Sequence, residues 1–288
     1  MTRTLRTLIV AGLACAWIGC QSSVSTLPRP PDYNALLSKT PRDAPPPDLP
    51  ETDESFWPVS DWPEEVMAYA ANAPNLNRVE REALLHINLV RSDPARYARE
   101  FIAPRRAFYD ENNIYRDPSL PEDFPGYQLV EGRAALDECL RRLERARPSR
   151  PVALYDELMV AAAKHAEDQR LTGSTGHLSS DGSSLGVRLN RIGSWRGKLG
   201  EVSAYGFSSG RQFITHFLID DGVPDRSHRE RLLDPSFRLI GVDFRAHPIY
   251  GSALVADLAT APSGSKRLRE LRESGLNDEL ATRIDLFD

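Results

Sequence analysis

The sequence predicts an α+β domain in which helices come first and an antiparallel hairpin comes last. Apolar residues recur at spacings of three and four over 79–90, 135–143 and 156–171, as on one face of a helix. Two strand-like runs follow, over 237–244 and 249–258, and no internal repeat interrupts this order. Helices that precede a short sheet pack against it, which favours an α+β fold or an α/β/α sandwich.

The first predicted helix begins near Val79 and ends before Pro94, which fits the first turn of a further helix or a kink. The second buries Cys139 on its apolar stripe, where a lone thiol is most simply a core residue. The third extends from about Asp156 to Leu171 and places His165 on its apolar face, as a core histidine.

The remaining segments contain fewer regular elements. Residues 104–132 resemble an irregular insertion, and residues 173–210 are rich in Gly and Ser and predict a loop with short elements. A further helix around 213–218 ends at Gly222 and Pro224. The two strands are joined around His247 and Pro248, so we expect His247 to be exposed in the turn.

The first 19 residues predict a signal peptide. Arg3 and Arg6 precede an apolar run from Leu8 to Ile18, which is too short to span a bilayer comfortably. The run ends in WIGC, which resembles a bacterial lipobox whose cysteine, here Cys20, is diacylated and becomes the mature N-terminus. Trp17 departs from that pattern, which usually has Leu there, so plain secretion and an uncleaved anchor stay as alternatives.

A lipid on Cys20 makes a membrane the first predicted partner. Several acyl chains anchor a protein stably, whereas one chain binds only marginally. Gln21 follows the cysteine, and by resemblance to enterobacterial sorting rules this favours the outer membrane. We therefore expect an exported protein that is lipid-anchored in the cell envelope.

A proline-rich tether is predicted over residues 20–76. Residues 21–76 hold 11 of the 22 prolines and few aliphatic residues, too few to offset the entropy of ordering the chain. Trp57 and Trp62 are exceptions, and we expect them to dock the end of the tether onto the domain. The domain is placed at 77–260, followed by a helical tail at 261–288 with an amphipathic pattern from Lys266.

Composition and charge exclude several classes of protein. Hydrophobic residues make up 41% and charged residues 27%, as in ordinary globular chains. The net charge is -5, which gives no electrostatic footprint for nucleic acid, so we expect no DNA or RNA partner. The 3 cysteines are too few and too scattered for a disulfide framework or a thiolate zinc site.

A metal site in this chain must therefore combine histidine with Asp or Glu. Of the 6 histidines, two lie in polar motifs without an obvious core role: His177 in GHLSSDG and His228 in SHRERLL. Glu201 begins a strand-like stretch in GEVSAYG. The sequence GSSLG at 182–186 matches a nucleophile elbow, but no hydrophobic strand precedes it, which argues against an esterase.

In the order and spacing of these motifs, the chain resembles the CAP superfamily of cysteine-rich secretory, antigen 5 and pathogenesis-related proteins, in its bacterial form. The resemblance covers roughly residues 80–259. It implies a three-layer α-β-α sandwich with a central antiparallel sheet, and a cleft with two histidines and two acidic residues that binds a divalent metal in some members. By motif, His177, Glu201 and His228 carry over to this cleft. The motifs that carry the resemblance are LHINLVR with Pro94, the segment 154–171, GHLSSDG, GE at 200–201, SHRE at 227–230, LDPSF at 233–237 and IGV at 240–242.

The fourth residue of this cleft is left open among Glu230, Asp220 and Asp221. If Ser227 caps a helix, Glu230 stands three residues later and completes a capping box. Residues two apart on a helix point about 200° apart, so His228 and Glu230 share a cleft only if the first turn is irregular. Capping and cleft lining thus remain equal alternatives for Glu230.

Three functions fit these residues. The first is a CAP-type module whose cleft binds an unidentified small-molecule, lipid or peptide ligand, with or without zinc or another divalent metal. The second is a zinc-dependent hydrolase or peptidase, in which Glu201 is a ligand or the general base. The third is a lipid or sterol binder, as the resemblance allows. A hydrogen-bonded polar network without a ligand is the structural alternative, and no reaction is assigned.

Overall fold

The computed structural model describes residues 53, 55, 57–73, 75–192, 195 and 197–260. The predicted signal peptide, Cys20, most of the predicted tether and the predicted tail at 261–288 lie outside the described residues. Within these ranges, no helix has both the length and the apolar character needed to cross a membrane.

One four-stranded sheet forms the centre of the domain, in the order β3-β5-β6-β4. Its long strands β4 (Leu199–Tyr205), β5 (Leu239–His247) and β6 (Gly251–Ala259) are antiparallel neighbours. The short strand β3 (Ala153–Leu154) pairs with β5 in parallel. The predicted antiparallel centre is therefore correct, and β3 makes the whole sheet mixed.

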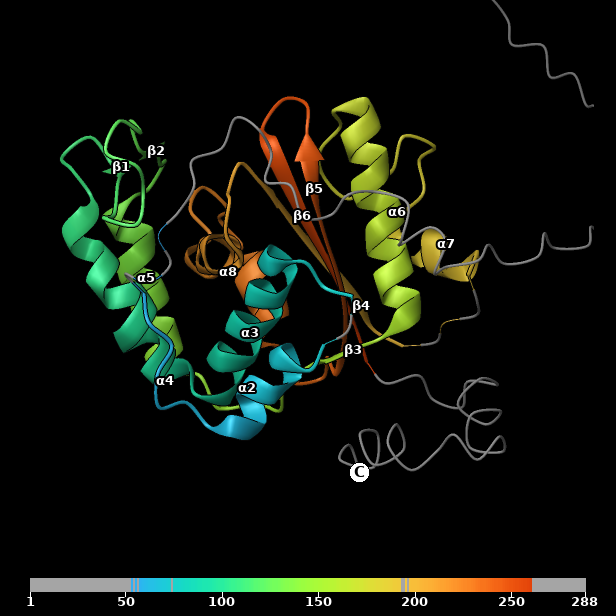
Figure 1. Ribbon diagram of the computed structural model, residues 1–288, viewed down its shortest axis with the longest axis horizontal. Coiled ribbons are helices and arrows are strands. Elements are labelled where there is room, and N and C mark those ends of the chain that lie inside the picture. The colour runs from blue at the N-terminus through green and yellow to red at the C-terminus, as the bar shows by residue number, and fades with distance from the viewer. Residues whose placement is uncertain are drawn as a thin grey trace, which may run out of the picture. The chain divides into compact units, whose positions relative to one another are not determined.

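Helices cover both faces of this sheet (Figure 1). The helices α6 (Asp156–Thr172) and α7 (Leu185–Asn190) lie on one face, and α3 (Arg78–Ser92) and α8 (Gly210–Ile219) lie on the other. Alternate residues of β5 follow this division, because Ile240 and Val242 point into the large core with α3 and α8. The predicted α-β-α sandwich is thereby confirmed.

The α6 face of the sheet is close-packed and partly polar. At Gly241 a side chain would place its Cβ 2.1 Å from the backbone carbon of Leu158, so only glycine lets α6 approach β5 this closely. Further along, small residues, Ala162 and Ala166, pack against Val255. The short side chains bring the helix near enough for its polar residues to reach the sheet.

The predicted helices are present, with local signals that define their ends. Asn77 caps α3 in a capping box with Glu80. Pro94 takes the first turn of the short helix α4 (Pro94–Tyr97), which continues as η2 (Ala98–Ile102) and η3 (Ala103–Phe108). The helix α5 (Arg133–Glu144) buries Cys139 as a free thiol, and burial raises the pKa of that thiol to about 12.

The segment predicted as an insertion, 104–132, is mostly irregular. It contains a small second sheet, in which β1 (Ile114–Tyr115) pairs with β2 (Tyr127–Gln128) in an antiparallel manner. Outside this sheet, Asp117 is buried and accepts hydrogen bonds from Tyr115 and Ser119. Arg211 of α8 donates to Ser119 Oγ at 3.1 Å and so ties the segment to the domain, a polar contact that hydrophobic periodicity does not reveal.

The prediction of a flexible tether is wrong for the last part of that segment. Residues 64–71 form the helix α2 (Glu64–Ala71), which packs against α3. Trp57 and Trp62 are only 5% and 6% exposed, as expected for docking residues. The indole N–H of Trp62 donates to Glu100 at 2.8 Å, and the Arg96 guanidinium lies 4.3 Å above its ring. Buried tryptophan surface offsets the ordering entropy here, although the proline content suggested otherwise.

The prediction that His247 is exposed is also wrong. Its ring is buried, and Nε2 lies 3.1 Å from the carbonyl oxygen of Ser174. Tyr205 and Tyr250 pack against it, with ring centroids 5.1 and 5.3 Å away. The turn places this histidine against the end of α6, a contact between segments far apart in the sequence.

Candidate functional site

His177 and Glu201 form the first of two histidine–carboxylate pairs. His177 lies in the loop after α6, and Glu201 is the third residue of β4. The imidazole Nδ1 is 2.8 Å from Glu201 Oε1. The His177 side chain is 47% exposed and that of Glu201 only 5%, so a surface imidazole is held by a buried carboxylate.

His228 and Asp220 form the second pair. Asp220 ends α8 in the left-handed conformation, with φ of 57°, which Asp tolerates better than most residues. Its Oδ1 is 2.7 Å from His228 Nδ1, and its Oδ2 accepts the backbone N–H groups of His228 and Arg229 at 3.0 and 3.3 Å. The ring of Phe217 packs beside His228 at 5.3 Å, so the imidazole is held by an apolar contact as well as a polar one.

The structure brings the two imidazoles together. The ring centroids of His177 and His228 are 6.4 Å apart, with an angle of 50° between the rings. Each Nδ1 faces a carboxylate oxygen. Because an ionised carboxylate only accepts, each Nδ1 carries the proton, and a neutral ring then keeps its lone pair on Nε2. Among the described residues, neither Nε2 atom has a hydrogen-bond partner.

Behind Glu201 lies a buried charge cluster. Arg188 donates to Glu201 Oε2, and Asp257 faces Glu201 directly across the strand pair β4–β6. Burial raises the pKa of Glu201, but the hydrogen bond from His177 and the positive charge of Arg188 outweigh it, so the net pKa is lowered. Burial and the charge of Glu201 together raise the pKa of Asp257 well above its usual range. Glu201 is therefore the ionised member and Asp257 the protonated one.

His165 supports the loop that carries His177. Its Nε2 lies 2.9 Å from the carbonyl oxygen of Gly176, and its Nδ1 lies 3.1 Å from Ser179 Oγ. Burial lowers the pKa of His165, which keeps it neutral. Tyr205 Oη accepts the backbone N–H of Gly176 at 2.9 Å. The prediction of a hydrogen-bonded core histidine is confirmed, and its partners fix the backbone next to His177.

The three candidates for the fourth position lie in different places. Asp220 contacts His228, as described above. Asp221 instead accepts the backbone N–H groups of residues 130–132, at 2.6, 2.8 and 2.7 Å. Glu230 pairs with Arg142 of α5 through two hydrogen bonds of 3.0 Å. The helix α9 (Ser227–Leu233) has Arg226 as its N-cap residue, without a side-chain bond, so the capping box predicted for Glu230 is absent.

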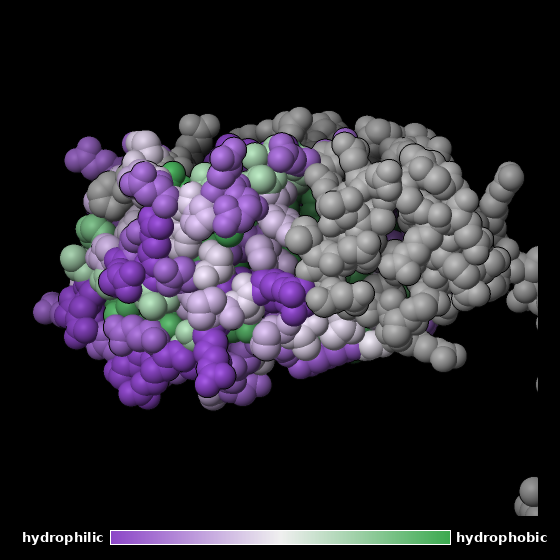
Figure 2. All heavy atoms as spheres, turned by 90° about the horizontal axis from the view of Figure 1, so that it is seen from below, coloured by the Kyte–Doolittle hydropathy of each residue, from purple (hydrophilic) through white to green (hydrophobic). Residues whose placement is uncertain are grey.

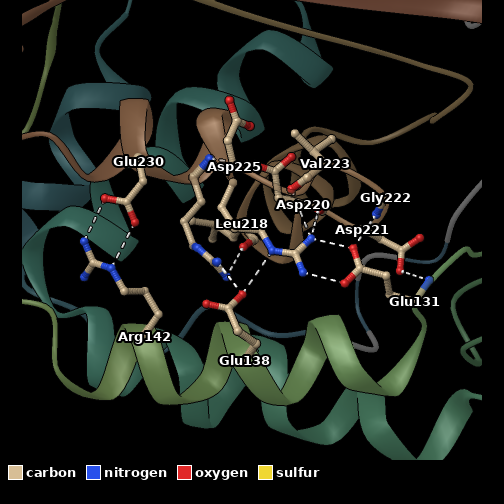
Figure 3. A network of polar contacts seen from close by, with 12 residues as sticks. Glu131, Glu138, Arg142, Leu218, Asp220, Asp221, Gly222, Val223, Asp225 and Glu230 are labelled. Atoms are coloured by element: carbon tan, nitrogen blue, oxygen red, sulfur yellow. Dashed lines mark hydrogen bonds and ion pairs between the residues drawn. The ribbon is translucent and has the colours of Figure 1, made fainter.

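A network of arginines fixes the loop that carries Asp220 (Figure 3). Arg226 donates to both oxygens of Glu131, at 2.7 and 2.6 Å, and to the carbonyl oxygen of Asp220 at 2.6 Å. Arg229 donates to Glu138 of α5 and, at 3.1 Å, to the carbonyl oxygen of Leu218. These contacts tie α5 to both ends of the loop between α8 and α9, and therefore fix the backbone of Asp220.

Sequence reasoning missed Arg188 and Asp257. Arg188 lies on the short helix α7, inside a segment predicted as loop, and its position gives no sign that it points inward. Asp257 stands in an apolar strand, opposite Glu201 in the antiparallel register. A charged residue in the middle of such a strand is the one signal that could have identified it as a buried partner.

The donor set for a metal is small. No cluster of three or more His, Cys, Asp or Glu suited to a metal ion occurs among the residues that the structure describes. Glu201 has both oxygens engaged, by His177 and Arg188. Nearby, burial lowers the pKa of His216 to about 4, so His216 adds no charge at neutral pH. The two Nε2 atoms are thus the available donors.

An α-β-α sandwich with two carboxylate-held histidines close together defines a specific class of domain. Residues 109–250 match the family model of CAP, the cysteine-rich secretory protein family, and the chain therefore contains a CAP domain. The match begins within the segment predicted as an insertion and ends at the turn between β5 and β6. It includes His177, Glu201, Asp220 and His228.

Two solved structures are similar to the chain. One is an outer surface protein from Borrelia burgdorferi, with 15% identity and a TM-score of 0.34, over 46% of this chain and 96% of that one. The other is an extracellular protein containing a SCP domain from Bacillus anthracis, with 21% identity and a TM-score of 0.33, over 51% of this chain and 46% of that one. No curated protein sequence matches the chain significantly.

Proposed function

We propose that this protein is an exported, lipid-anchored envelope protein whose His177 and His228 bind a divalent metal, with zinc as the preferred ion. Two imidazole donors leave further coordination positions to water or to a donor atom of a ligand. The protein then acts by binding, and its own residues supply no reaction. The CAP domain is the scaffold that brings the two histidines together.

The observation that supports metal binding is the orientation of the two imidazoles. Each Nδ1 is within 2.8 Å of a carboxylate that is almost fully buried, Glu201 for His177 and Asp220 for His228. Metal-binding histidines typically donate their second N–H to a carboxylate, which fixes the tautomer and raises the basicity of the other nitrogen. Glu201 and Asp220 therefore orient the two ligands and do not themselves bind the metal.

A zinc-dependent hydrolase is less well supported. Such an enzyme needs a general base that is free to accept a proton. Glu201 is the predicted base, but Arg188 and His177 hold both its oxygens and its pKa lies below the usual value. A carboxylate held in this way is a weak base. Three protein ligands, the number usual at catalytic zinc, are also absent from the described residues.

Zinc titration by calorimetry tests the proposed site. We expect binding to the wild-type chain with one zinc per protein, and loss of that binding in the double variant His177→Ala, His228→Ala. The variant His247→Gln is the matched control, because it removes a histidine that lies in the hairpin turn beside Ser174. Binding in the double variant equal to the wild type, or no binding by the wild type above a chelator background, would refute the site.

The envelope location rests on the sequence of the first 21 residues. The signal-peptide pattern and Cys20 in WIGC support export and lipidation. We expect metabolic labelling with radioactive palmitate to label the wild-type protein, and the variant Cys20→Ser to lose the label. Fractionation should place the mature protein in the outer membrane. A labelled Cys20→Ser variant would exclude this lipidation site.

A further inference from the structure

A strongly basic segment lies at the end of α5 and in the loop that follows it. Residues 141–150 read RRLERARPSR, with five arginines and one glutamate, so the segment carries a formal charge of +4. The whole chain, in contrast, has a net charge of -5. The electrostatic potential around these ten residues is therefore positive, although the protein as a whole is acidic.

This segment passes under the end of the sheet where β5 begins. The backbone N–H of Ser149 donates to the carbonyl oxygen of Arg91 at 2.7 Å, and Arg91 Nε donates to the carbonyl oxygen of Arg150 at 2.9 Å. Arg238, directly before β5, pairs through its carbonyl with the N–H of Ala153. Figure 2 views the molecule from below, and hydrophilic side chains gather there on the side of α4 and α5.

Arginine charges in this basic end lower one another's pKa. Burial and the neighbouring charge of Arg150 lower the pKa of Arg238. Burial and the charge of Arg238 lower the pKa of Arg91 to about 10. Arg91 itself is fully buried, and carbonyl oxygens surround its guanidinium. Positive charges that repel each other in this way leave a potential that an anion would neutralise.

The exposed arginines of the segment differ from many of the arginines elsewhere on the surface, which pair with carboxylates. Arg141, Arg145 and Arg147 are exposed, and among the residues that the structure describes no carboxylate pairs with any of them. Several other surface arginines do have such a partner. Examples are Arg106 with Asp137, Arg170 with Glu167 and Arg191 with Asp181. The three exposed arginines, close together in sequence, are therefore available to an external anion.

We propose that this basic end, formed by Arg141, Arg145, Arg147 and Arg238, binds the phosphate headgroups of anionic phospholipids in the membrane that carries the protein. Guanidinium groups bind phosphate with two parallel hydrogen bonds and are only weakly hydrated, which suits them to a lipid surface. The inference rests in part on the lipid anchor proposed above. It adds a second contact between the protein and its membrane.

The path of the chain favours a membrane as the partner. Arg96 of α4, just after the end of α3 where Arg91 lies, donates to the carbonyl oxygens of Asp61 and Ser60 at 3.0 and 2.9 Å. The described chain thus enters the domain at the same end as the basic segment. Cys20 precedes this entry point in the sequence, so a lipid there would connect the membrane to the same end of the domain.

Vesicle co-sedimentation tests the surface apart from the anchor. The full chain with Cys20→Ser is mixed with vesicles of phosphatidylcholine alone, or of phosphatidylcholine and phosphatidylglycerol in equal parts. We expect binding to the anionic vesicles only, weakened by salt because exposed charges are screened. Each arginine near an anionic surface strengthens binding about fivefold, so the triple variant Arg141→Gln, Arg145→Gln, Arg147→Gln should bind on the order of 100-fold more weakly.

The triple variant Arg106→Gln, Arg170→Gln, Arg191→Gln is the matched control, since it removes the same charge from paired arginines elsewhere. It should retain most of the binding. Equal losses in both triple variants would assign the effect to net charge and overturn the proposed surface, as would absence of binding to the anionic vesicles. Zinc binding and palmitate labelling are measured separately, so a failed anchor or metal site does not affect this outcome.

Discussion

Glu201 and Asp257 stand directly opposite each other on β4 and β6, and Asp257 shares its face of the sheet with Val255, which packs against α6. Asp257 is fully buried, and Arg188 compensates the charge of Glu201. Two carboxyl groups this close do not both ionise. The ionised Glu201 is therefore paired with Arg188 and stands beside a protonated Asp257. This buried group fixes the carboxylate that orients His177.

The variant Asp257→Asn should be more stable than the wild type at neutral pH. The folded-state pKa of Asp257 is raised, so its protonated form stabilises the fold below the unfolded-state pKa of 3.8, and that contribution is lost as pH rises. Asparagine does not ionise and so avoids this loss of stability. Each pKa unit by which Asp257 is shifted corresponds to about 1.4 kcal/mol in the free energy of unfolding. Urea unfolding should show a gain at pH 7 that shrinks toward pH 4. An equal effect at both pH values would contradict this account.

Replacing Arg188 by Gln should destabilise the protein strongly. The change leaves Glu201 and Asp257 in a buried site without a positive charge, and breaking one partner of a buried ion pair costs about 3 to 5 kcal/mol. The exposed pair Arg142–Glu230 supplies a control, because Arg142→Gln should cost under about 1 kcal/mol. Chemical denaturation measures both. Similar losses would show that Arg188 is not a buried counter-charge.

Asp220→Asn should weaken zinc binding by about 10- to 100-fold, the usual effect of removing a carboxylate that orients a histidine ligand. Asparagine tolerates the left-handed backbone of Asp220, so the turn should be kept. The control Asp221→Asn weakens only bonds to the backbone of residues 130–132 and should leave zinc affinity unchanged. Calorimetry compares the two, and an unchanged affinity in Asp220→Asn would contradict the role of Asp220.

Trp62→Ala should reduce the free energy of unfolding by about 3 to 5 kcal/mol, as for other buried aromatic truncations. The ring lies under Arg96, and its N–H binds Glu100, so both contacts disappear together. Trp62→Phe keeps most of the apolar contact and should lose less. Stability equal to the wild type in Trp62→Ala would mean that residues 57–73 do not contribute to the folded domain.

Most of the helical framework could be predicted, because its signals are local. The stripe of α3, the cap at Asn77 and the proline at the start of α4 each act within a few residues. The strand β4 was harder, because it lies in a Gly- and Ser-rich stretch and is buried through pairing with β6. Its partner is more than 40 residues away in sequence, so no local pattern defines it.

Motifs pointed to the histidines of the candidate site, but not to the groups behind them. His177 and His228 stand in polar motifs, whereas Arg188 and Asp257 reach Glu201 only through tertiary packing. For Glu230 a local motif was misleading, because its spacing from Ser227 matches that of a capping box. In the structure, Glu230 instead forms a bidentate pair with Arg142 of α5. The N-cap of α9 is Arg226 and not Ser227, so no capping box forms.

The most direct test of the proposed metal site is a crystal structure of the full mature chain with zinc bound. We predict zinc held by the Nε2 atoms of His177 and His228, at the usual distance of about 2.0 to 2.1 Å, with Glu201 and Asp220 still on the Nδ1 atoms. Zinc bound by a Glu201 oxygen, or bound away from both histidines, would contradict the account.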